Sequence, residues 1–252
     1  MSSHFACIGF PIREIREYHA LMHEAAARGH RMPLPGGGTL ARWEVGGGPE
    51  IWVVIAAEGD VLDATPFFST GEALRVAVTA HGEDAEEVEA GWVEGWVEPV
   101  EPDEPLSGAF PVRIDLVNFP LVRDRLRAGA IVPVEFCGIA HEATLYPNAE
   151  AYEAVRQVQY QPPMRSFTSV GHFSADPVLD EVEATALISG IITEPRLLTN
   201  AETGAPYWWL RVDTEKVTVS VLVDRETLPA EPQQGNIVSA SCWIVGRVIP
   251  TE

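Results

Sequence analysis

Two stretches of this chain repeat one short pattern, a hydrophobic-polar pair, a loop, a glycine and two β-branched residues, at identical spacing. The two copies are Val117-Asn118, Gly129 and Ile131-Val132, and Val223-Asp224, Gly235 and Ile237-Val238. Each copy is typical of a strand, a turn that ends in glycine, and a second strand. The repeat therefore predicts two tandem copies of a small β-unit, and it constrains the architecture more than any other feature.

Residues 1–70 are predicted to form an N-terminal α/β segment. Phe5–Gly9 has the pattern of a short strand. Pro11 suits the first turn of a helix and Gly29 suits the position just after its end. Apolar residues between them recur at helical spacing, and Gly46–Gly48 then separates two strand-like runs, which indicates a hairpin. The expected order is β-α-β-β.

Residues 71–156 are expected to be a β-rich unit. It contains an acidic span, 83–104, with ten acidic residues and no basic one. Within that span the tetrapeptide Gly-Trp-Val-Glu occurs twice, at Gly91 and at Gly95. Two tryptophans are unusual in a disordered acidic loop, so we expect a strand with a charged outer face here.

Residues 157–177 have the composition of a linker, and 178–252 fit five strands. The order is three strands, a longer connector and two more strands, with Gly190 placed where a barrel strand could bend. This is the order of an OB-fold, a small Greek-key barrel that binds oligonucleotides or oligosaccharides in many proteins. The fold class expected is mostly β (α+β), with two small β-barrel units after the N-terminal segment, the last OB-fold-like and able to fold alone.

The two copies agree in part. Val132, Val134 and Phe136 fall in phase with Val238, Ala240 and Cys242, but the preceding strands do not: Val219 and Val221 align with Arg113 and Asp115. A slip of one residue exchanges the two faces of a strand. The duplication therefore requires a bulge or a different register in one copy.

The chain also resembles a family of uncharacterised bacterial proteins that end in an OB-fold-like domain. The segments that carry the resemblance are Gly48–Val53, Leu116–Asn118, Ile188–Ile192 and Thr199–Gly204. The resemblance implies the fold and contributes no catalytic residues. A single lysine, Lys216, beside many arginines and alanines is typical of GC-rich bacterial genes.

The charge limits the partners. The chain carries 37 acidic and 17 basic residues, a formal net charge of -20. Such a surface disfavours nucleic acid and anionic membranes, because both are negatively charged. The start of the chain shows no secretory signal and the three cysteines are scattered, so a cytoplasmic location is expected. A protein, peptide or sugar ligand fits best, and no motif calls for a cofactor.

Two groups of residues are candidate sites. Trp208, Trp209 and Arg211 lie on a predicted OB strand, where aromatic side chains bind ligands, although alternation places the two indoles on opposite faces. A tryptophan packed between domains is the alternative. The second candidate is a metal site of the glyoxalase type, from His4, His81 and Glu135 together with Glu44.

The helical pair His19 and His23 lacks the glutamate of a metalloprotease motif, and the glycine clusters lack the spacing of phosphate loops. No catalytic residues are therefore predicted. The sequence favours a non-catalytic binding or assembly protein that uses an OB-like barrel. The alternative is a metal-dependent small-molecule enzyme that uses N-terminal histidines.

Overall fold

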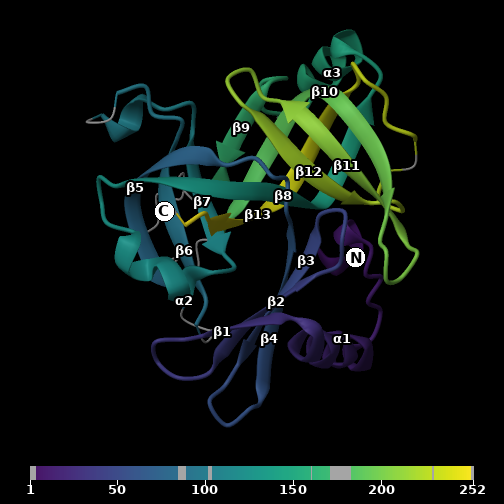
Figure 1. The fold of residues 1–252 in the computed structure, drawn as a ribbon. Coiled ribbons are helices and arrows are strands. Elements are labelled where there is room, and N and C mark those ends of the chain that lie inside the picture. The colour runs from purple at the N-terminus through teal and green to yellow at the C-terminus, as the bar shows by residue number, and fades with distance from the viewer. Residues whose placement is uncertain are drawn as a thin grey trace.

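The structure, a computed structural model, describes residues 4–84, 89–101, 104–159, 161–170, 183–228 and 230–250. Strands dominate, as predicted, and form one four-stranded and one nine-stranded sheet. Figure 1 shows the smaller sheet at the bottom beside a long helix, with the larger sheet curving through the two halves above. No helix within the described ranges is long and apolar enough to cross a membrane.

The N-terminal unit begins with a 3-10 helix, η1 (His4–Ile8), so the strand predicted there is wrong. Phe5 to Ile8 are all buried, a pattern that a half-buried strand cannot produce. Helix α1 (Ile15–Arg28) and its end at Gly29 follow the prediction, but the helix begins at Ile15, so Pro11 is not in its first turn as expected. The smaller sheet is an antiparallel meander of β1 (His30–Pro33), β2 (Thr39–Glu44), β3 (Pro49–Ile55) and β4 (Val61–Phe68). The predicted hairpin is β2 and β3.

The larger sheet contains the remaining strands. They are β5 (Leu74–Glu83), β6 (Gly91–Val97), β7 (Pro111–Leu116), β8 (Ile131–Tyr146), β9 (Ser166–Ser169), β10 (Thr185–Thr199), β11 (Pro206–Asp213), β12 (Thr218–Asp224) and β13 (Ile237–Val248). Short helices connect them: η2 (Pro105–Ser107), α2 (Phe119–Val122), η3 (Arg123–Arg125) and α3 (Ala149–Arg156). The two strands predicted at the end of the chain are one strand, β13, with a register shift between Ser241 and Cys242.

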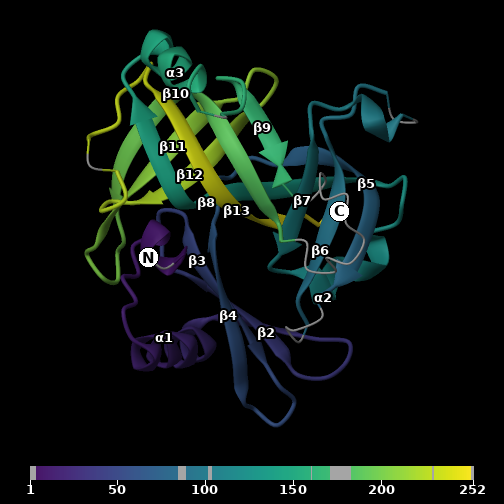
Figure 2. The same cartoon turned by 180° about the vertical axis from the view of Figure 1, so that it is seen from behind.

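Eight of the nine strands make two rings of pairings that share two members. In the first ring β5 pairs with β6, β6 with β7, β7 with β13, β13 with β8, and β8 with β5. In the second ring β10 pairs with β11, β11 with β12, β12 with β8, β8 with β13, and β13 with β10. Figures 1 and 2 show β8 and β13 crossing from one half of the molecule to the other. β9 adds an outer strand beside β10.

The shared strands make the two rings interdependent. β8 follows β7 in the chain, yet its second half lies parallel to β12, and the end of β13 lies parallel to β7. The boundary proposed at 157–177 would assign β8 to one unit alone, whereas the structure places it in both. Part of that proposed linker is β9, and residues 171–177 lie outside the described residues. One hydrophobic core runs through both rings.

The sequence repeat corresponds to this arrangement. By the spacing of the repeat, Gly138 corresponds to Ile244. These two residues pair directly across β8 and β13, so the two copies meet at equivalent positions there. Asp115 pairs with Val245 and Leu222 pairs with Ile139, and Ile139 corresponds to Val245 by the spacing of the repeat. Asp115 is therefore equivalent to Leu222, and the inner residues Val112, Ile114 and Leu116 correspond to Val219, Val221 and Val223. The earlier mismatch is therefore a one-residue difference in the connectors, and Arg113 and Asp115 face outward.

Candidate functional site

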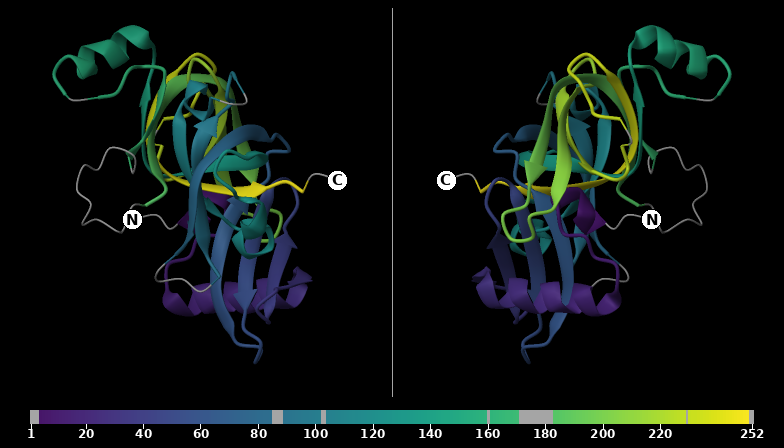
Figure 3. Two further views of the ribbon diagram at one scale, coloured as in Figure 1. Left: turned by 90° about the vertical axis from the view of Figure 1, so that its left-hand side faces the viewer. Right: turned by 90° about the vertical axis from the view of Figure 1, so that its right-hand side faces the viewer.

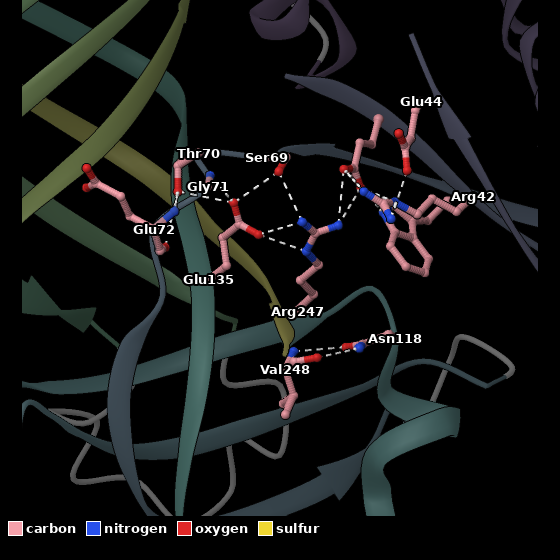
Figure 4. Close-up of polar contacts among 12 residues, drawn as sticks. Arg42, Glu44, Ser69, Thr70, Gly71, Glu72, Asn118, Glu135, Arg247 and Val248 are labelled. Atoms are coloured by element: carbon pink, nitrogen blue, oxygen red, sulfur yellow. Dashed lines mark hydrogen bonds and ion pairs between the residues drawn. The ribbon is translucent and has the colours of Figure 1, made fainter. Parts of the chain in front are cut away.

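A buried polar network joins the N-terminal unit to the rings. The Arg247 guanidinium on β13 contacts Glu135 (2.7 Å) on β8 and Glu50 (3.1 Å) on β3. Arg42 also binds Glu50, and the Gly71 amide donates to Glu135 at 2.6 Å. Figure 4 shows Arg247 between its partners, and the hydroxyl groups of Ser69 and Thr70 complete the hydrogen-bond donors around Glu135. Every charge is paired, so this network positions the two sheets relative to each other.

This network accounts for one predicted metal ligand, and the others lie elsewhere. Glu135 is saturated by the contacts above. His4 Nε2 lies 3.0 Å from Nδ1 of His141, and His81 on β5 packs near Phe119. Glu44 pairs with Arg42. Within the ranges that the structure describes, no three His, Cys, Asp or Glu side chains are grouped so that they could hold a metal ion.

The two predicted ligand tryptophans lie on opposite faces of β11, as the alternation indicated, and Trp209 has the interdomain packing that was the alternative. Trp208 points into the ring core and is 3% exposed, while Trp209 packs with Tyr207 and Leu222 against the N-terminal unit and is 9% exposed. Arg211 forms a two-bonded ion pair with Glu72. The outer face of β11 and β12 is therefore covered within the molecule, and the two indoles have the packing of core side chains.

The corresponding face of the first ring has a different character. β6 alternates strictly: Gly91, Val93, Gly95 and Val97 are buried, and the residues between them are partly exposed. The repeated Gly-Trp-Val-Glu thus places both tryptophans and the intervening glutamate outside. The closeness of the Phe119 ring and the Ala77 carbonyl requires glycine at the two inner positions. A strand with a charged outer face was expected here, and the alternation agrees with it.

We name this surface the indole–carboxylate face. It consists of Trp92, Glu94, Arg113 and Asp115 on β6 and β7, and Trp243 on β13. The Arg113 guanidinium lies 3.8 Å from the centre of the Trp92 ring and pairs with Glu94 at 3.2 Å. Its buried Nε has no hydrogen-bond partner among the described residues. Trp92 in turn packs over Gly82, where a side chain would collide with the indole.

Asp115 is the chemically distinct member of the face. Its carboxylate accepts a hydrogen bond from the Trp243 indole at 2.6 Å, and within the described part of the chain it forms no ion pair. Burial raises the pKa of Asp115 to about 6, and the negative charges of Asp84 and Glu183 add to this, while the Trp243 hydrogen bond and Arg113 act against it.

A histidine pair borders the face. The His4 ring packs 4.9 Å from Trp243, and burial lowers the pKa of His4 to about 4, with the charge of His141 as the second cause. His141 is the extra residue at the register shift between β8 and β13, because Ala140 and Glu142 pair with consecutive residues. A bulge of this kind redirects a side chain out of the sheet. His4 is therefore neutral at neutral pH, where it packs on the indole that binds Asp115.

Comparison of the chain with protein-family models, with curated proteins and with solved structures gave no match. The sequence contained a signal for the indole–carboxylate face. The tetrapeptide repeat is a whole multiple of the two-residue alternation of a strand, so Trp92, Glu94 and Trp96 all lie on one side.

Proposed function

We propose that this protein is a non-catalytic binding protein built on two OB-like rings, and that the indole–carboxylate face is where it binds its ligand. In each ring three sequential strands are followed by two long ones, and the third strand is parallel to the fifth, which comes from the other copy. This is a Greek-key order of five strands, and OB-folds bind ligands on strands two and three.

The observation that carries the proposal is the contrast between two matched positions. Trp92 pairs across the sheet with Asp115, and Trp209 occupies the equivalent place opposite Leu222. The N-terminal unit covers Trp209 and Leu222, whereas Trp92 and Asp115 remain partly exposed. A carboxylate where the covered ring has a leucine indicates a face that meets water or a polar ligand.

Electrostatics favour a protein, peptide or sugar ligand over nucleic acid. The strongly negative chain offers few cations for phosphates, and the one arginine on the face already pairs with Glu94. Aromatic rings bind sugars and peptide side chains through their flat apolar surfaces. No observation in the described residues supports the metal-dependent alternative, since its three residues are not brought together.

The test is nuclear magnetic resonance of the tryptophan indole N–H groups at 0.15 M salt. Three probes are titrated separately: a twelve-residue peptide rich in Lys and Arg, cellohexaose, and a twelve-nucleotide oligothymidine. We expect saturable shifts of the Trp92 and Trp243 signals with the peptide or the sugar and none with the oligonucleotide. Trp208 and Trp209 are internal controls. If neither the peptide nor the sugar moves Trp92 and Trp243, or if the buried pair moves equally, the proposal is wrong.

A further inference from the structure

The carboxylate of Asp115 has the surroundings of a cation-binding group that has no cation within the described chain. It is partly buried, it accepts one hydrogen bond from Trp243, and it forms no ion pair with any described residue. A desolvated carboxylate is costly unless a positive charge compensates it. The one nearby guanidinium, Arg113, is directed to Glu94 and the Trp92 ring instead.

The groups around Asp115 increase its need for a cation. Asp84 after β5 and Glu183 before β10 are negative, and both disfavour its ionised form. His4 on η1 is neutral at pH 7, since its pKa is about 4. The charge balance around Asp115 is therefore negative, on a face that also carries two indole rings and the Arg113–Glu94 ion pair.

We infer that the ligand bound at the indole–carboxylate face presents a lysine or arginine side chain, whose positive group lies against Asp115 and whose methylene chain lies along Trp243 and Trp92. This inference rests on the proposed function and specifies its partner as a basic protein segment. Indole rings attract cations over their faces, and the pairing of Arg113 with Trp92 at 3.8 Å shows the same chemistry within the chain.

The matched position in the second ring supports this assignment. There the residue equivalent to Asp115 is Leu222, which is fully buried under the N-terminal unit, and its neighbour Trp209 donates its indole N–H to Ser220 at 3.1 Å. On the face that the N-terminal unit covers, this position is the uncharged Leu222. On the partly exposed face it is the carboxylate of Asp115, which an external cation could neutralise.

The experiment compares two peptides that differ only at their basic positions, by isothermal calorimetry and indole resonance at 0.15 M salt. One carries Lys and Arg, and the other carries acetyl-lysine and citrulline, which keep the shape and remove the charge. The full chain is tested with Asp115→Asn and Asp115→Leu, and with Asp60→Asn as the matched control, since Asp60 lies in an exposed turn. The Trp208 signal reports whether each variant is folded.

We expect the charged peptide to bind at least tenfold more tightly than the neutral one, and each Asp115 variant to remove most of that difference. Asp60→Asn should change affinity less than twofold. Binding should weaken as pH falls through about 6, because Asp115 becomes protonated there. Asp84, Glu183 and Arg113 act on the same carboxylate, and His4 packs on its partner Trp243.

Three outcomes would overturn the inference, each in a distinguishable way. Equal binding of both peptides with shifts of Trp92 and Trp243 would leave the proposed function standing and reject the cation. Equal losses in Asp60→Asn and Asp115→Asn would show diffuse attraction to the net charge. Binding of cellohexaose in place of both peptides would assign the face to a sugar. An Asp115→Asn variant that does not fold would leave Asp115→Leu, with the residue of the matched position, to decide the matter.

Discussion

The outer faces of β6–β7 and of β11–β12 occupy equivalent positions in the two rings, but the first is partly exposed and the second is covered. Both have a tryptophan at the same place, Trp92 in one and Trp209 in the other. In the second copy η1 packs on β12 and β11, and the apolar set of Tyr207, Trp209 and Leu222 becomes part of the core with α1 and β2–β4. In the first copy the surroundings of the tryptophan are charged.

The two equivalent faces thus differ in what covers them. The outer face of β11–β12 is apolar and packs against the N-terminal unit, which the buried network at Arg247 also joins to the rings. The other keeps an arginine, two carboxylates and two indoles partly exposed. The side views in Figure 3 show the N-terminal unit gathered at one end of the molecule, away from α3 at the other. A binding face can therefore be sought by asking which copy of a repeated surface the chain leaves uncovered.

The largest expected effect comes from separating the two copies. A fragment of residues 178–252 contains β10 to β13 but lacks β8, which pairs with both β12 and β13. We expect it to lack a cooperative fold, because two strands would lose a partner and their inner residues would meet water. Circular dichroism and amide resonance dispersion measure this. A dispersed spectrum and a cooperative melt would show instead that each copy closes without the other.

That expectation reverses the one drawn from sequence, and the reason is physical. Periodicity and turn residues predicted the strand in the acidic span, β6, and the three strands before the connector in 178–252, because these are local features. Pairing of β8 with β12 is a contact between residues far apart in sequence. Nothing in the alternation of either strand specifies its neighbour, so the exchange of strands could not be read from the pattern.

The exposure of the candidate site residues is also a non-local property. Alternation places Trp208 and Trp209 on opposite faces of one strand, but whether the outer face is covered depends on how the N-terminal unit docks. The equivalent tryptophan in the first copy, Trp92, was visible in a repeated tetrapeptide that was assigned only to a charged face. Helical spacing predicts the body and the end of α1. The short apolar run before it predicts a strand, but such a run also fits the 3-10 helix η1 that the chain forms.

The second effect tests the two tryptophans directly. We expect Trp209→Ala to lower the free energy of unfolding by about 3–5 kcal/mol, because it opens a cavity at the junction with the N-terminal unit. Trp92→Ala should cost about 1–2 kcal/mol, since its ring is partly exposed and loses chiefly the contact with Arg113. Chemical denaturation of both variants gives the comparison. Equal costs would mean that the first face is as much a core as the second.

The smallest effect concerns pH, and it has opposite signs at two neighbouring groups. The pKa of Asp115 is about 6 in the folded state against 3.8 for the free side chain, so folding favours its protonated form. Its contribution to stability is present at pH 4 and is lost as pH rises through about 6. His4 behaves in reverse: its pKa falls from 6.5 to about 4, so its contribution is present at pH 7 and is lost as pH falls towards 4.

Because the two contributions oppose each other, we expect each to become visible only when the other is removed. Relative to the wild type, Asp115→Asn should gain about 1–3 kcal/mol of stability between pH 4 and pH 7. At pH 7 His4→Gln should be less stable than the wild type, because it lacks the contribution of His4. This difference should shrink as pH falls, and near pH 4 the variant should be the more stable protein. Denaturation at five pH values measures both, with Asp60→Asn as the control for one lost charge. Leu222 stands at the matched place in the covered copy and has no titrating group, so a pH-independent difference for Asp115→Asn would remove the chemical distinction between the two faces.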